Sequence, residues 1–228
     1  MIEKNTILIS HYNSLAFIKL LDLFKDFNIN VYNKSGRGLV KSNIQQTILQ
    51  NEGRETHTYL KYIIDNYEDI SPVSVLIQDD TNNHIHNYKH FRKYVDSFIE
   101  ESKYFEVYPA QWREDCDLTI KRTIHNGVLP SADDPPGERL PHVPSTHAKT
   151  IVNLIAKKFN LHVPKIYDTY CCAFLICSKK SIHSHPKQFY IDLLNFYMTN
   201  EICSTHIKGY VFEHIWKLIF MNSESDNK

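Results

Sequence analysis

The apolar segment from Val73 to Ile77 constrains the fold of this chain more than any other segment. It has the length of a strand, and Gln78-Asp79-Asp80 follows it at once. Such a run is typical of a sheet that is covered on both faces, as parallel sheets are. The chain also opens with a predicted strand at Thr6–Ser10, a helix at Leu15–Phe27 and a strand at Asn28–Tyr32. That order predicts a parallel βαβ unit.

The rest of the chain continues to alternate between helices and strands. Apolar residues at helical spacing predict helices at Thr56–Tyr67, Asn87–Ser102, Thr146–Phe159, Pro186–Tyr197 and Val211–Met221. The pattern predicts a strand at Tyr170–Cys177 and a long loop at Pro109–Pro144. We therefore expect one α/β domain over residues 1–221, with a mixed, mostly parallel sheet flanked by helices. Residues 222–228 are expected to form a flexible tail.

The composition narrows the class of protein. The chain has 228 residues, 42% of them hydrophobic, which is enough for one large domain with a sizeable core. Its 26 basic and 26 acidic residues balance, so net charge does not favour nucleic acid or an acidic membrane as a partner. Without a secretory leader or an apolar run of about 18 residues, we expect a cytoplasmic chain that does not span a membrane. The five cysteines form no C-x-x-C pair, which favours reduced thiols over disulfides or zinc.

The first candidate site lies where the central strand ends. Carboxylates at the carboxyl end of such a strand lie where open α/β sheets bind ligands. Asp79 and Asp80 offer the oxygen ligands that a hard divalent cation needs, and the nearby His84 and His86 offer nitrogen ligands for Mn²⁺ or Zn²⁺. The alternative is a solvated acidic turn with surface histidines.

Two further segments carry candidate residues. Arg54 and Glu55 lie just before the predicted helix Thr56–Tyr67, where the free N–H groups of the helix start and a guanidinium suit an anion. The alternative for this segment is an ordinary helix entry with a salt bridge. Near the end of the chain, Glu213 and His214 lie on an amphipathic helix, where His214 is a candidate ligand or simply a structural residue.

Several segments together resemble the uncharacterised domain-of-unknown-function family numbered 3431. They run from near residue 7 to near residue 220, almost the whole chain. The most specific one is Gly53-Arg54-Glu55-Thr56-His57-Thr58-Tyr59-Leu60. The other segments are Ser10–Asn13, Val31–Lys34, Ile63–Tyr67, Ile77–Asp80 with His84, Tyr170–Ser178 and Glu213–Phe220.

A more distant similarity is to the GT-A glycosyltransferases. The nucleotide-sugar half of these enzymes looks like the first part of this chain in the order of its elements. That order is strand, Tyr/Asn, helix, strand, loop, helix, strand and acidic end. In that family a D-x-D motif holds Mn²⁺ or Mg²⁺ on a nucleotide diphosphate, and a later His often joins the shell. In this chain Gln78 stands where the motif has its first Asp, and Asp80 stands where it has its second.

The similarity implies roles for particular residues. It implies a nucleotide-sugar half at residues 1–108 and an acceptor half at 109–221. Asp79, Asp80, His84 and His214 would bind Mn²⁺ or Mg²⁺, with Asp80 and Asp134 as catalytic residues; Asp133 and Asp168 are further candidates for the base. The substrate-binding residues would be His11, Tyr12, Asn13, Asn33, Lys34, Arg54, Glu55 and Gln78.

The function expected from these features is glycosyl transfer from a nucleotide-sugar donor to a glycan or protein acceptor. Two alternatives stay open. One is a non-catalytic glycan- or protein-binding module, suggested by the many tyrosines and the missing D-x-D. The other is a metal-dependent hydrolase built on the cluster of Asp79, Asp80, His84 and His86.

Overall fold

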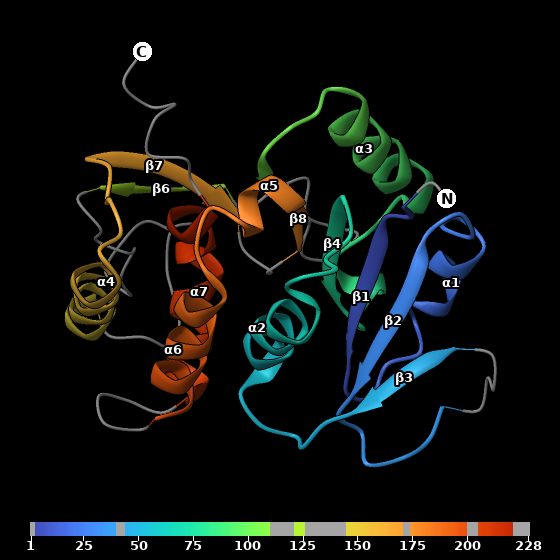
Figure 1. Ribbon diagram of the computed structural model, residues 1–228, viewed down its shortest axis with the longest axis horizontal. Coiled ribbons are helices and arrows are strands. Elements are labelled where there is room, and N and C mark those ends of the chain that lie inside the picture. Colours follow the sequence, from blue (N-terminus) through green and yellow to red (C-terminus); the bar gives the residue numbers. More distant parts are fainter. Residues whose placement is uncertain are drawn as a thin grey trace.

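The computed structural model describes residues 3–39, 44–109, 121–125, 145–170, 174–199 and 205–220. Within these residues, six strands form one sheet in the order β3-β2-β1-β4-β8-β5 (Figure 1). Their bounds are β1 Thr6–His11, β2 Asn28–Asn33, β3 Gln45–Ile48, β4 Val73–Gln78, β5 Phe105–Val107 and β8 Leu175–Ser178. The neighbours in β3-β2-β1-β4 are parallel, whereas β8 is antiparallel to both β4 and β5. The mixed, mostly parallel sheet of an α/β protein is confirmed.

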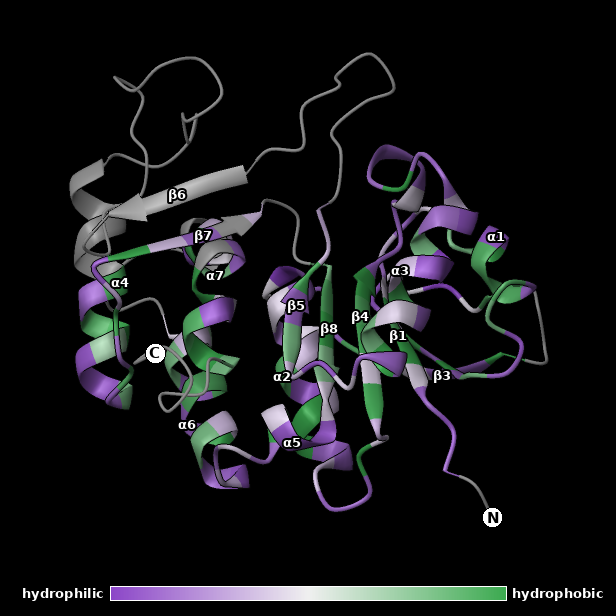
Figure 2. Cartoon of the chain, turned by 90° about the horizontal axis from the view of Figure 1, so that it is seen from above, coloured by the Kyte–Doolittle hydropathy of each residue, from purple (hydrophilic) through white to green (hydrophobic). Residues whose placement is uncertain are grey.

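Helices cover both faces of this sheet, because its strands carry apolar side chains on both faces. Ile7, Ile9, Val75 and Ile77 pack with two helices on one face, α1 Ile18–Leu21 and α3 Tyr88–Glu100. Leu8 and Leu76 point to the other face. There they pack with α2 Arg54–Asn66, α6 Lys187–Met198 and α7 Thr205–Phe220. Seen from above in Figure 2, the hydrophobic strands β4 and β8 lie between these helical layers.

A second, two-stranded sheet lies beyond these helices. Strands β6 Lys121–His125 and β7 Ile166–Tyr170 pair antiparallel in Figure 1, near helix α4 Ser145–Phe159. The short elements η1 Thr81–Asn83 and α5 Lys179–Ile182 complete the described structure. The segment 109–144 was expected to be an irregular loop, and β6 shows that expectation to be wrong in part.

Two other predictions needed correction. The predicted strand Tyr170–Cys177 is two strands in different sheets, because β7 pairs with β6 while β8 pairs with β4 and β5. The predicted helix Leu15–Phe27 is regular only over α1, and hydrogen-bonded turns follow it up to Phe27. Strand β2 begins at the next residue, so the chain must turn back toward the sheet before the helix can extend.

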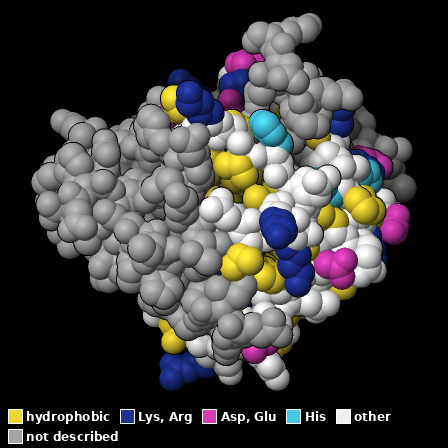
Figure 3. Space-filling model, turned by 90° about the vertical axis from the view of Figure 1, so that its left-hand side faces the viewer, with side chains coloured by type: hydrophobic (Ala, Val, Ile, Leu, Met, Phe, Trp, Pro, Cys, Tyr) yellow, Lys and Arg dark blue, Asp and Glu magenta, His cyan; other side chains and the backbone are white. Residues whose placement is uncertain are grey.

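One face of the molecule shows how the charged side chains are distributed. On the described part of the face in Figure 3, basic and acidic side chains lie interspersed among hydrophobic and neutral ones. In the described part of the chain, no helix is both long and apolar enough to cross a bilayer.

Candidate functional site

The parallel register brings the carboxyl ends of three strands together. His11 at the end of β1 is level with Asn33 at the end of β2, and Ser10 is level with Gln78 at the end of β4. The loops after β1, β2 and β4 therefore start side by side at one edge of the sheet. Gln78 is only partly buried there. Ligands of open α/β sheets bind at this edge.

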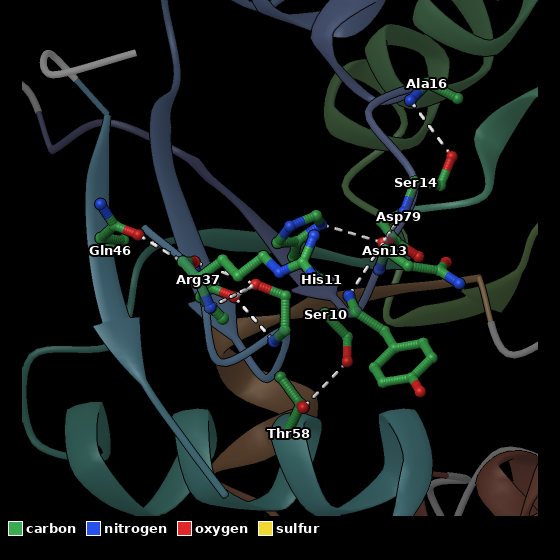
Figure 4. A network of polar contacts seen from close by, with 12 residues as sticks. Ser10, His11, Asn13, Ser14, Ala16, Arg37, Gln46, Thr58 and Asp79 are labelled. Carbon is green, nitrogen blue, oxygen red and sulfur yellow. Dashed lines mark hydrogen bonds and ion pairs between the residues drawn. The ribbon is translucent and has the colours of Figure 1, made fainter. Parts of the chain in front are cut away.

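Asp79 fastens the loop that follows β1. Its Oδ2 accepts hydrogen bonds from the backbone N–H groups of Tyr12, Asn13 and Ser14 at 2.8–2.9 Å. The same oxygen lies 2.9 Å from Nδ1 of His11 (Figure 4). Only 6% of Asp79 is exposed. A carboxylate in this position organises a nest of N–H groups. Asp79 therefore acts on the site by holding the β1 loop in place.

The bonds to Asp79 also set how stability depends on pH. Burial raises the pKa of the Asp79 carboxyl, but the bonds from His11 and the three N–H groups outweigh burial and lower the pKa below its ordinary 3.8. The stabilisation is complete above pH 3.8 and is lost as the pH falls through the pKa of the folded state. We expect urea unfolding between pH 6 and pH 3 to show this loss. The variant Asp79→Asn should lack that component, and an identical acid dependence of both proteins would contradict the assignment.

Asn33 holds the loop after β2 in a similar way. Its side-chain N–H₂ donates to the carbonyl of Arg37 at 2.7 Å and to Oε1 of Gln46 at 3.1 Å. Its Oδ1 accepts from the backbone N–H and the hydroxyl of Ser35 at 2.9 and 2.6 Å. Asn33 is completely buried. Like Asp79, it positions a loop instead of facing solvent.

Between the two fastened loops lies a cavity of about 550 Å³. Its volume is that of a site for a small molecule or cofactor. Figure 4 shows the side chain of Arg37 extending from the β2–β3 loop toward His11. The cavity is lined by His11, Tyr12, Asn13, Leu15, Phe17, Ile18, Ser35, Arg37, Gly38, Leu39 and Ile44. Three predicted binding residues, His11, Tyr12 and Asn13, thus meet at one cavity.

Arg37 was not among the predicted site residues. In the sequence it belongs to a Gly-rich turn, Lys34–Gly38, which predicted only a loop. Arg37 could have been predicted as a site residue, because it is a basic residue just beyond the carboxyl end of a predicted parallel strand. In the tertiary structure the loop after β1 lies opposite this turn, and Arg37 therefore lines the cavity between the two.

Lys34, another predicted binding residue, is not among the residues that line the cavity and is 4% exposed. Its ammonium group donates to the carbonyl oxygen of Glu52 at 2.7 Å and to that of Arg54. Burial lowers the pKa of Lys34 to about 8, while Glu55 and Glu52 act in the opposite direction. Lys34 therefore holds the turn at Glu52 and Gly53 against the start of α2, whose first two residues are Arg54 and Glu55.

Among the described side chains, the predicted metal ligands Asp79, Asp80 and His84 do not form a metal-binding group. Oδ2 of Asp79 already has its four partners, and Asp80 accepts from Nδ2 of Asn83 at 2.6 Å. His84 is buried beside Phe174, and burial lowers its pKa to about 4. Within the described ranges, no three His, Cys, Asp or Glu side chains are grouped so that they could hold a metal ion. These residues do not fit a metal held by the protein alone, and Mn²⁺ or Mg²⁺ stays a prediction.

The remaining candidates lie away from this edge or outside the described residues. The backbone of His214 is part of α7, but its side chain lies outside the described part. Asp133 and Asp134 also lie outside it. Asp168, on β7, lines a second cavity of about 270 Å³ between β5, β7 and α7, and its carbonyl accepts from Nζ of Lys217 at 3.1 Å.

The fold and the cavity define the class as an α/β protein with a cavity beyond the carboxyl ends of parallel strands. The sequence identifies the family. A family described as "Protein of unknown function (DUF3431)" matches residues 10–227, and the chain belongs to this family. No curated protein matches the chain in sequence. The family description names no activity.

Proposed function

We propose that this protein is a glycosyltransferase that binds a nucleotide-sugar donor at the carboxyl edge of its sheet. The observation that carries the proposal is the cavity between the loops after β1 and β2. Its walls are fixed by the buried residues Asp79 and Asn33, so the site needs little ordering when a ligand binds.

The lining of the cavity suits a nucleotide. Tyr12 and Leu15 are about half exposed, at 50% and 55%, and offer an aromatic and an aliphatic surface to a base. Arg37 is exposed and offers a guanidinium to the diphosphate. The N–H groups of residues 12–14 already donate to Asp79, whereas the exposed guanidinium of Arg37, in the described part of the lining, can balance phosphate charge.

The order of the elements supports the same proposal. It runs β1, α1, β2, β3, α2 and β4, and then Asp79-Asp80. The similarity to the GT-A nucleotide-sugar half depends on this order, except that β3 lies where the sequence predicted a loop. In the proposed reaction an acceptor hydroxyl bonds to the anomeric carbon and loses its proton to a base, while the bond from that carbon to the diphosphate breaks. The diphosphate leaves with the bonding electrons and gains negative charge, which the guanidinium of Arg37 stabilises.

The test is nucleotide binding by the variant Arg37→Ala. We expect it to bind UDP or GDP about tenfold more weakly than the wild type, since a charge-assisted hydrogen bond contributes roughly 1.5–3 kcal/mol. Isothermal titration calorimetry measures the effect. The control is Lys93→Ala, which removes one positive charge from the exposed side of α3. Wild-type protein that binds neither nucleotide, or equal affinity in the wild type and Arg37→Ala, would refute the proposal.

The same titrations, with nucleotide-sugars and with and without Mn²⁺, separate the alternatives. Formation of glycosylated product supports transfer, whereas binding without turnover indicates a non-catalytic module. Tightly bound zinc or a di-metal centre in the purified protein would favour the hydrolase. The described positions of Asp79, Asp80 and His84 give that alternative no support.

A further inference from the structure

Arg54 and Glu55 form a polar pair in the first turn of α2, facing α7. The guanidinium of Arg54 lies over the ring of Tyr210, 4.6 Å from its centroid. Gly209 leaves room for this arrangement, because a Cβ there would be 2.8 Å from Cδ of Arg54. The pair therefore occupies a defined place between the two helices.

The pair has unused capacity for hydrogen bonds. Glu55 is 8% exposed, yet its carboxylate makes no hydrogen bond within the described part of the chain. Its ion-pair partner, Nε of Arg54, is 3.6 Å away, beyond hydrogen-bond distance. Nη1 of Arg54 is also buried without a hydrogen-bond partner. Buried polar groups are nearly always hydrogen-bonded, so the unpaired Nη1 of Arg54, next to the Glu55 carboxylate, indicates a missing partner.

The backbone beneath the pair is strained and held in place. Gly53 and Arg54 have φ angles of 61° and 48°, in the left-handed region. The buried ammonium of Lys34 binds the carbonyl groups of Glu52 and Arg54 on either side of this strained step. Strain of this kind persists where the surroundings enforce it, and it is common at functional sites.

The pair and the nucleotide cavity share one edge of the sheet. Oγ of Ser10, at the end of β1, donates to Oγ1 of Thr58 in α2 at 2.9 Å (Figure 4). The next residue, His11, lines the cavity. Thr58 lies one turn beyond Arg54, so a ligand that extends from the cavity along this edge approaches the N-terminal half of α2.

We propose that Arg54 and Glu55 bind the hydroxyl groups of a carbohydrate ring. This inference rests on the proposed function and names the sugar subsite of that site. A sugar hydroxyl donates to the Glu55 carboxylate, and a sugar oxygen accepts from Nη1 of Arg54. A phosphate would be repelled by Glu55 and a cation by Arg54, whereas a neutral ring satisfies both groups.

The experiment compares Glu55→Gln with the wild type in two arms. In the first, calorimetry compares UDP with UDP-glucose and GDP with GDP-mannose, so that only the sugar differs. In the second, a panel of free mono- and oligosaccharides is tested by saturation-transfer NMR and titration, because the ring can belong to the donor or to an acceptor. The control is Glu52→Gln, which neutralises an exposed carboxylate three residues away from Glu55.

We expect Glu55→Gln to weaken the sugar-bearing ligand about tenfold, to leave UDP and GDP unchanged, and to melt no lower than the wild type. Glu52→Gln should match the wild type in both arms. The inference is overturned if sugar affinity stays within about twofold of wild type in both arms, or if Glu55→Gln loses affinity only by unfolding. If free sugars bind in a Glu55-dependent way but no nucleotide binds, the proposed glycosyltransferase function is refuted and the sugar subsite is supported. If no ligand binds in either arm, both the glycosyltransferase function and the sugar subsite are refuted.

Discussion

Replacing Gly53 with Ala is expected to destabilise the protein by roughly 2–5 kcal/mol. A left-handed backbone costs an L-residue about 1–2 kcal/mol, and forcing a methyl group into a packed site costs about 1–3 kcal/mol more. Gly53 has a φ of 61°, and an added Cβ would be 2.6 Å from Cβ of His57 and 2.8 Å from Sδ of Met198. Cβ of His57 is fixed to the backbone of α2, so it cannot move aside without moving the helix.

Thermal unfolding measures this effect, and we expect a fall in melting temperature of roughly 5–15 °C for a domain of this size. The matched control is Gly36→Ala. Gly36 has a φ of 69°, but no atom lies within 4 Å of its added Cβ. It should therefore show only the conformational cost, about 1–2 kcal/mol. Equal losses in the two variants would mean that α2 and α6 are not packed against Gly53 as described.

Asp79→Ala is expected to destabilise the protein by about 3–4 kcal/mol and to weaken nucleotide binding at least tenfold. The change leaves three backbone N–H groups and the His11 ring without their acceptor, and each buried unsatisfied donor costs about 1–3 kcal/mol. Water entering the vacated space offsets part of the total. The loss of affinity follows because Tyr12 and Asn13, which line the cavity, are no longer held.

The neighbouring carboxylate supplies the control for this prediction. Asp80 is partly exposed and accepts from Asn83, so Asp80→Ala should cost at most about 1 kcal/mol. Urea unfolding at pH 7 and calorimetry with UDP or GDP measure the two effects. If Asp80→Ala removed nucleotide binding and Asp79→Ala did not, the metal site predicted from the sequence would be the better account.

Much of the fold follows from local pattern. The apolar run at β4 and the helical spacing in α2, α3, α4 and α6 placed these elements within two residues of their observed bounds. The pattern did not predict the short strands β3, β5 and β6 or the early end of α1. Strands of three to five residues carry too few side chains for a period to stand out, and their stability depends on neighbours that are distant in the sequence.

The sequence by itself determined that polar residues follow the carboxyl ends of buried parallel strands, because apolar runs and turn residues report where a strand stops. Only the tertiary structure decided what those residues do. Asp79 and His11 are 68 positions apart, and the parallel register of β1 and β4 brings them together. Through their hydrogen bonds Asp79 and Asn33 support the loops after β1 and β2, and Arg37 lines the cavity between these loops. Two groups form a hydrogen bond only if they lie close together in space, and the spacing of residues along the sequence does not give that distance.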